Sequence, residues 1–188
     1  FEKFLNEFPT SPYAEKVSNY LVEVYMNTRS YDAALKSIDR IAKPSAQILE
    51  AKQKILFQLG TQSFANADFE QALKYLNQSI AIGQYNRQTK ADAYYWCGES
   101  YYRLNRMVEA ARDFNAYLQL TTQPNNEMYA LANYNLGYIA FHRKDYTQAS
   151  NYFQKYIQLE KGENTTALAD AYNRIGDCHL HVRNFEEA

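Results

Sequence analysis

The sequence lacks the features that mark several classes of protein. No apolar run approaches the roughly 18 residues that a membrane-spanning helix needs, so we expect no membrane insertion by this chain. The 20 Lys and Arg residues nearly balance the 21 Asp and Glu residues. A balanced charge favours neither a nucleic-acid-binding surface nor a trap for acidic substrates.

Residues suited to metal binding or catalysis are also scarce. Of the three histidines, His179 and His181 are two apart on one expected helix and point in different directions, and His142 lies on another helix. A metal site needs an i, i+4 spacing or a converging carboxylate. No Ser or Cys has a credible His and Asp partner, and no glycine-rich loop cradles a phosphate. We therefore expect no metal, no cofactor and no enzymatic activity.

Proline and glycine are rare, with four and six residues, whereas Ala, Leu, Gln, Lys, Glu and Arg are plentiful. This composition favours helix, and no strand pattern is present. Ser45 is the expected N-cap of one helix and Gly83 the expected end of another. The predicted helices span residues 1–8, 12–28, 31–42, 46–66, 69–82, 88–104, 107–121, 127–143, 146–160 and 165–182.

The few glycines are regularly placed. An aromatic-x-x-Ala signature recurs, with Met once replacing the aromatic, at Tyr31–Ala34, Phe69–Ala72, Met107–Ala110, Tyr146–Ala149 and Phe185–Ala188. Twelve residues before each Ala lies a slot occupied in turn by Val22, Gly60, Gly98, Gly137 and Gly176, at spacings of 38, 38, 39 and 39. Small residues at this offset let two antiparallel helices approach closely, with aromatic side chains filling the space around the contact. Repetition at such a period indicates an array of helix hairpins.

These residues resemble the tetratricopeptide repeat, whose pattern runs Leu-Gly, Tyr, Ala, Phe and Pro. Leu59-Gly60 and Leu136-Gly137 match the Leu-Gly pair, Tyr101 fills a Tyr slot, and Phe114 and Phe153 fill Phe slots. The Trp slot is not filled, and the period exceeds the family's usual length of about 34 residues. The resemblance implies an all-α fold, a right-handed α-solenoid of stacked antiparallel hairpins. It also implies that the first helices line a concave face.

The opening segment, from Phe1 through Pro9 to Tyr13, is similar to long-period repeats of Gram-negative envelope proteins. Examples are the lipoprotein of outer-membrane barrel assembly and the periplasmic coordinator of the Tol-Pal system. This similarity implies the periplasm or cell envelope, with the cytoplasm as the alternative. We expect one array over 1–188, cut from a longer chain, with weak self-association through the cut ends. Its repeats would span about 1–9 (partial), 12–43, 45–83, 88–123, 126–162 and 165–188 (partial).

The predicted binding site is an aromatic-rich groove on the concave face. Its residues are Tyr95, Glu99, Tyr102, Arg103, Tyr134, Tyr138, Phe141, His142 and Asp177. Amphipathic aromatic side chains on a rigid surface suit recognition of a peptide or partner protein. Chaperone-binding members of the family clamp a C-terminal carboxylate with basic and Asn side chains. Because Glu99, Tyr138 and Asp177 occupy those slots, we do not expect this binding mode. The acidic residues around the predicted centre outnumber its one permanent positive charge, Arg103, so we expect an apolar or mildly basic ligand; these acids are Asp92, Glu99, Asp170 and Asp177.

Two other interpretations remain open at this stage. The aromatic side chains could simply pack between repeats, which would leave the array as a structural spacer or self-assembly module of a larger envelope or secretion complex.

Cys97 and Cys178 lie on first helices two repeats apart, too far for a disulfide, and we expect both to be free and buried.

Overall fold

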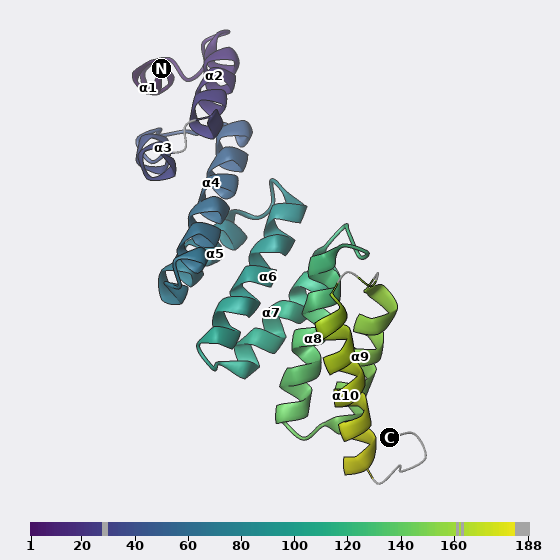
Figure 1. Ribbon diagram of the computed structural model, residues 1–188. Helices are drawn as coiled ribbons and strands as arrows, with labels where there is room; N and C mark the ends of the chain where they lie inside the picture. The colour runs from purple at the N-terminus through teal and green to yellow at the C-terminus, as the bar shows by residue number, and fades with distance from the viewer. Residues whose placement is uncertain (28–29, 161, 163, 183–188) are drawn as a thin grey trace.

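The computed structural model describes residues 1–27, 30–160, 162 and 164–182, which form ten helices and no strand (Figure 1). Three hairpins, α4–α5, α6–α7 and α8–α9, follow the shorter pair α2–α3, and α10 packs against α9. The bounds are α1 Glu2–Glu7, α2 Ala14–Asn27, α3 Tyr31–Ile38, α4 Ala46–Ala65, α5 Phe69–Ile82, α6 Arg87–Arg103, α7 Met107–Leu120, α8 Glu127–His142, α9 Tyr146–Leu159 and α10 Thr165–His181.

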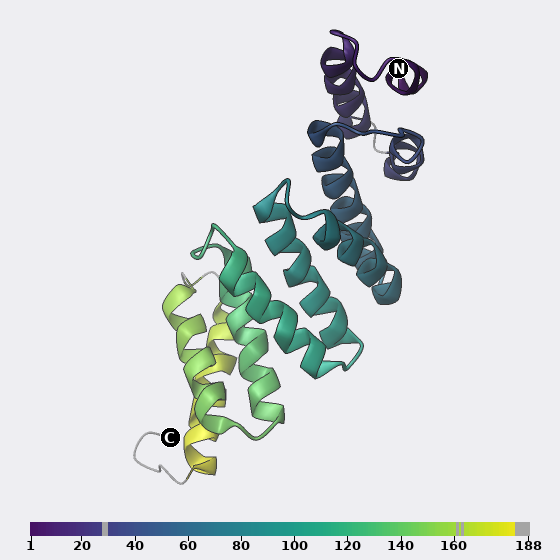
Figure 2. The ribbon, with the colours of Figure 1, turned by 180° about the vertical axis from the view of Figure 1, so that it is seen from behind.

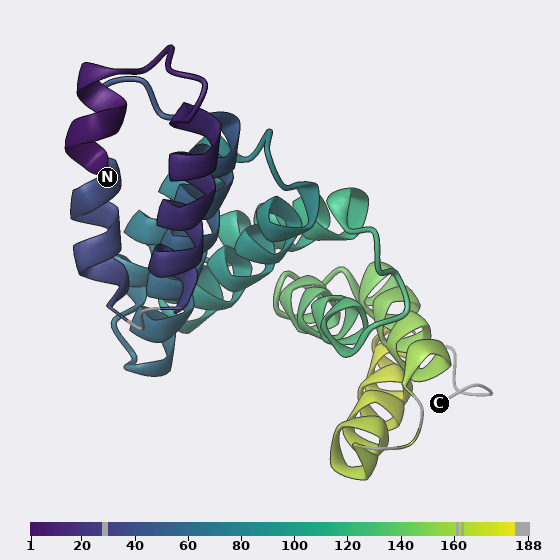
Figure 3. The same cartoon turned by 90° about the horizontal axis from the view of Figure 1, so that it is seen from above.

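The hairpins stack one after another into an elongated array, with α1–α3 at one end and α10 at the other (Figures 2 and 3). The predicted fold class, an α-solenoid of stacked antiparallel helix hairpins, is therefore confirmed. None of the helices in the described ranges is long and apolar enough to cross a membrane. The last signature, Phe185–Ala188, lies outside the described residues.

Each complete hairpin turns at one residue with a left-handed backbone. These residues are Ala67, Asn105 and Lys144, with φ of 60°, 59° and 62°. The next amide donates back to a carbonyl five residues earlier, as in the bond from Arg106 N to Tyr101 O of 2.8 Å. Such a bond satisfies carbonyls left open at the end of a helix. The turn thus reverses the chain without a glycine.

The glycine slots hold the two helices of a hairpin in close contact, but the partner differs from the one expected. A Cβ added at Gly98 would lie 2.8 Å from the ring of Phe114, and one at Gly137 would lie 2.8 Å from the ring of Phe153. At Gly60 it would lie 2.6 Å from Leu76. The glycine therefore makes room for the large side chain one turn beyond the expected Ala, because that side chain fills the space between the helices.

The first pair departs most from the prediction. Helix α3 ends at Ile38, four residues before the predicted end. The chain leaves the helix there to bury Ile41, and Asn6 binds the backbone beyond it, donating to Arg40 O at 2.8 Å and accepting from Ala42 N at 2.9 Å. Helices α2 and α3 also make less contact with each other than the helices of the later pairs. In this pair the slot that holds glycine in the later hairpins is occupied by Val22.

Polar side chains fix the connections between repeats. The fully buried Gln53 donates to Asn86 O at 2.8 Å and accepts from Asn86 N at 3.0 Å. Ser45 is an N-cap as predicted, accepting from Ile48 N at 3.4 Å, and Asn residues cap the three later first helices. Cys97 and Cys178 are free and buried, as expected.

Candidate functional site

The predicted groove residues lie on the first helices α6, α8 and α10. We call the side of these helices that carries them, together with the side of α4 that carries Phe64, the groove face. Consecutive first helices contact each other along it. The ring of Trp96 on α6 lies 4.9 Å from that of Phe64 on α4, and Asn135 on α8 donates a hydrogen bond to Glu99 on α6. The face is therefore a continuous surface across repeats.

The α6 part of the groove face is built around a buried carboxylate. Glu99 is 8 % exposed and accepts from Asn135 Nδ2 and, at 3.2 Å, from the hydroxyl of Tyr95. Arg103 lies 3.7 Å away on the next turn. Burial raises the pKa of Glu99, and the arginine and the two hydrogen bonds oppose the increase.

Tyrosine hydroxyls from α8 meet one carboxylate of α10. Tyr134 donates to Asp170 Oδ2 at 2.7 Å, and Tyr138 donates to the same oxygen. Arg174 lies 3.6 Å from Asp170 and 2.8 Å from Asp177, so both acids share this cation. Burial is the first cause of the raised pKa of each tyrosine, and the neighbouring carboxylate adds to it.

Aromatic stacking fixes the far end of the face. The Phe141 ring lies 5.4 Å from Tyr146 and 5.7 Å from the guanidinium of Arg174. His181 stacks on Tyr146 with ring centroids 4.2 Å apart. Aromatic and cation–π contacts of this kind hold side chains in fixed orientations.

The predicted site residues divide by exposure. Tyr95 is 4 % exposed and packs against the α7 aromatics, with its ring 5.4 Å from that of Tyr117, so Tyr95 and Glu99 support the groove from beneath rather than offering contact surface. The accessible residues are Tyr102, Arg103, Tyr134, Tyr138, Phe141, His142 and Asp177. The aromatic residues among them are half-buried and pack in part against the core clusters, namely Tyr102, Tyr134, Tyr138 and Phe141.

Trp96 belongs to the groove face but was missing from the predicted set. It lies two residues before Gly98, and its half-buried ring contacts Phe64 and Tyr95. The same slot holds Asn135 in the next repeat, which also reaches back to the preceding first helix. The period alone would have pointed to this slot.

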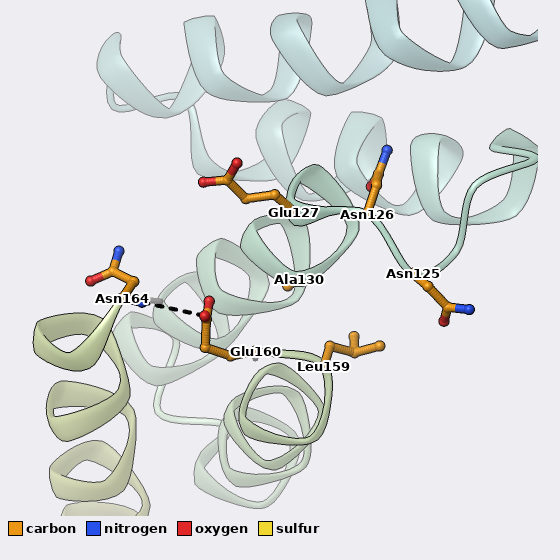
Figure 4. A pocket seen from close by; sticks show the side chains of 7 residues that line it. All are labelled: Asn125, Asn126, Glu127, Ala130, Leu159, Glu160 and Asn164. Atoms are coloured by element: carbon orange, nitrogen blue, oxygen red, sulfur yellow. Dashed lines mark hydrogen bonds between the residues drawn. The ribbon is translucent and has the colours of Figure 1, made fainter. Parts of the chain in front are cut away.

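A separate cavity of about 190 Å³ lies where the α7–α8 and α9–α10 connections meet. In Figure 4 the side chains of Asn125 and Glu127 point in different directions, and the drawn hydrogen bond joins Asn164 N to Glu160 at 3.3 Å. The polar groups do not converge on a common point. Among the described residues no group of three or more His, Cys, Asp or Glu could hold a metal ion.

Several solved structures share this fold at low sequence identity. A crystal structure of MamA matches with 18 % identity and a TM-score of 0.60, covering 94 % of this chain and 87 % of that one. BtubC from P. vanneervenii matches with 13 % identity and a TM-score of 0.64, covering 93 % and 75 %. YrrB, described as a TPR protein with an unusual peptide-binding site, matches with 15 % identity and a TM-score of 0.56, covering 88 % and 76 %.

No curated protein sequence matches the chain. Two family models do match it, and both describe the tetratricopeptide repeat. One covers residues 57–127 and the other residues 130–162, which together make up more than half of the sequence. The matched ranges include the second half of α4, helices α5 to α7 and nearly all of α8 and α9, and they contain the contacts in which a glycine and a large apolar side chain meet. The chain therefore belongs to the tetratricopeptide repeat family.

Proposed function

We propose that this chain is a protein–protein interaction scaffold that binds a peptide or partner protein along the groove face. Tetratricopeptide repeat proteins are generally non-enzymatic scaffolds, and YrrB, which shares the fold, is described as having a peptide-binding site. Stacked repeats offer long surfaces for such ligands.

The observation that carries this proposal is a set of accessible aromatic side chains whose positions are already fixed. The hydroxyl of Tyr138 is bound by Asp170, and its ring lies 5.3 Å from that of the buried Phe153. Phe141 is held between Tyr146 and Arg174. Ordering flexible side chains opposes binding, so side chains that are fixed beforehand bind at lower entropic cost.

The centre of the proposed site comprises Tyr102, Arg103, Tyr138, Phe141 and His142. Capture of stoichiometric partners by the full chain, followed by Tyr102→Ala with Tyr138→Ala, tests it. We expect the double variant to lose the partner while its helical circular dichroism is unchanged. Tyr102→Phe with Tyr138→Phe keeps both rings and should keep most of the binding.

The matched control lies on the opposite side of the array. Gln148 and Lys155 are exposed on the second helix α9, and replacing both with Ala should leave binding unchanged. If these changes abolished binding and the tyrosine variants did not, the groove assignment would be wrong.

One observation favours the alternative role of a structural spacer. Hydrogen bonds between successive first helices, Asn135 to Glu99 and Tyr134 to Asp170, satisfy polar groups of the groove face and hold neighbouring repeats together. A spacer needs this rigidity and no ligand.

We also propose, from the resemblance of the opening segment, a place in a Gram-negative cell envelope. Fractionation of cells that produce the full-length protein tests this location.

A further inference from the structure

Four carboxylates occur on or beside the groove face, and three of them lie beside an arginine of the chain. Glu99 lies beside Arg103, while Asp170 and Asp177 share Arg174. Asp92 differs, because no cationic side chain of the described ranges lies within ion-pair distance of it. Asp92 accepts a hydrogen bond from Gln88 Nε2, at 2.7 Å on Oδ1.

The repeat explains why Asp92 is left open. Asp92 and Asp170 occupy the same slot, six residues before Gly98 and Gly176. At Asp170 two hydroxyls of the preceding first helix, from Tyr134 and Tyr138, occupy the carboxylate. The corresponding residues before Asp92 are Phe57, which has no hydroxyl, and Thr61, which donates its hydroxyl to Gln58 O at 3.0 Å.

The carboxylate of Asp92 is nevertheless held in place. The side-chain oxygen of Gln88 accepts from Thr122 N at 2.9 Å and from Thr122 Oγ1 at 2.7 Å. These bonds fix which end of the amide faces Asp92, so the Nε2 group donates to it. Because this carboxylate is already positioned and its second oxygen is free, little conformational entropy is lost when a ligand donates a hydrogen bond to it.

Partial burial of Asp92 strengthens the interaction of its carboxylate with a cationic hydrogen-bond donor of a ligand. The residue is half-buried, and desolvation raises the pKa of its carboxyl, with only the Gln88 bond acting against the increase. A partly desolvated carboxylate gains more from a cation than one that is fully in water.

Trp96 lies one turn further along the same face of α6. Side chains four apart on a helix are neighbours, with Cβ atoms roughly 5–6 Å apart. The indole is held by Phe64 at 4.9 Å and Tyr95 at 5.4 Å between ring centroids. Tryptophan is the aromatic side chain that best attracts a cation placed over its ring.

We propose that Asp92 and Trp96 form a subsite for an arginine side chain of the segment that binds the groove face. The guanidinium stacks on the indole and donates to Asp92 Oδ2, an arrangement that suits its planar array of donors. This inference rests on the proposed function and adds a chemical class of ligand to it. A partner with a basic side chain near an apolar segment fits, whereas an acidic tail does not.

The test uses the fluorescence of Trp96, which is the single tryptophan of the sequence. The probe is acetyl-Ala-Arg-Ala-amide, titrated at low ionic strength into the full chain and compared with the same peptide carrying citrulline, the neutral isostere of arginine. We expect a saturable change in fluorescence with the arginine peptide, and binding of the citrulline peptide that is weaker by a factor of about two to five, as for a partly exposed ion pair.

The variant Asp92→Asn removes the charge and keeps an acceptor for Gln88, so it should weaken the arginine peptide by the same factor. The matched control is Asp39→Asn, which removes a carboxylate that lies outside the predicted binding site and is already paired with Lys52 at 2.6 Å, and it should leave the titration unchanged. A lysine peptide should bind more weakly than arginine but more tightly than citrulline. Equal binding of arginine and citrulline, an unchanged titration of Asp92→Asn, or no fluorescence change up to about 10 mM peptide would overturn the subsite.

The outcome separates this inference from the proposed function. If a captured partner depends on Tyr102 and Tyr138 but not on Asp92, the groove function stands and the arginine subsite falls. If the arginine peptide depends on Asp92 while no partner depends on those tyrosines, the subsite stands and the groove function falls.

Discussion

Replacing Gly137 with alanine tests how a hairpin of this array is packed. An ideal Cβ at this position lies 2.8, 2.9 and 3.0 Å from three ring carbons of Phe153. Carbon atoms in favourable contact are about 3.5–4.0 Å apart, so the ring must move. Phe153 is fully buried, and its ring is flanked by those of Tyr134 at 5.8 Å and Tyr138 at 5.3 Å.

Two effects of opposite sign decide the result. Alanine is favoured over glycine in a helix by about 1 kcal/mol. An extra methyl group in a well-packed core costs about 1–3 kcal/mol. We therefore expect Gly137→Ala to lower the free energy of unfolding by about 0–2 kcal/mol instead of raising it. Gly137→Leu adds three more carbons at the same contact and should lower it by about 3 kcal/mol.

Urea unfolding followed by helical circular dichroism measures these changes. Ala169→Gly, at an exposed position of α10, reports helix propensity alone and should cost about 1 kcal/mol. Val22→Leu should cost less than Gly137→Leu, because that slot already accepts a branched side chain. Two results would show that Gly137 is not tightly packed against Phe153. One is that Gly137→Ala raises the free energy of unfolding by as much as Ala169→Gly lowers it. The other is that Gly137→Leu and Val22→Leu lower the free energy of unfolding equally.

Three further results are expected. Ala67→Gly should stabilise the chain by about 1 kcal/mol in the same urea assay, since alanine pays for its φ of 60° and glycine does not. Burial raises the pKa of Glu99, so the folded state binds the proton of this side chain more tightly than the unfolded state does. As the pH rises from the unfolded pKa through the folded pKa, the free energy of unfolding of the unaltered chain should therefore fall relative to that of Glu99→Gln. Parallel pH profiles of the two chains would contradict this. Burial raises the pKa of the Cys97 thiol and raises the pKa of the Cys178 thiol to about 11. Neither thiol should therefore react with a maleimide near neutral pH before the chain unfolds. Rapid labelling of the native chain would show instead that the thiols are accessible.

The sequence predicted the helices well because their determinants are local. The glycine slot, the aromatic-x-x-Ala signature and the polar turn lie within one hairpin, and α4, α5 and α7 fall within one residue of their predicted ends. Where a distant residue decides the end, prediction failed. Helix α3 stops early because Asn6, more than thirty residues earlier, binds the backbone beyond it.

The groove face was harder to predict because contacts between repeats set its exposure. Helical spacing places Tyr95 and Tyr138 on the same general side of their helices, yet Tyr95 is buried against Tyr117 while Tyr138 stays partly accessible. The bond from Asn135 to Glu99 joins residues 36 apart. Periodicity identifies residues that share a face, but the angle between successive hairpins decides which of them remain at the surface.

Equivalent slots along the groove face hold different side chains in different repeats. In the last two repeats the chain satisfies its own acids, so the tyrosines, Asp170 and Arg174 lock α8 to α10. Two repeats before Asp170 the same slot holds a carboxylate, Asp92, without the hydroxyls that would occupy it. A polar group that is partly buried without full compensation lowers stability, so the repeat gains nothing structural from Asp92. The rigid end and the open end of the groove face thus differ by substitutions at equivalent positions, and the proposed binding centre lies between them, on α6 with Tyr102 and Arg103 and on α8 with Tyr138, Phe141 and His142.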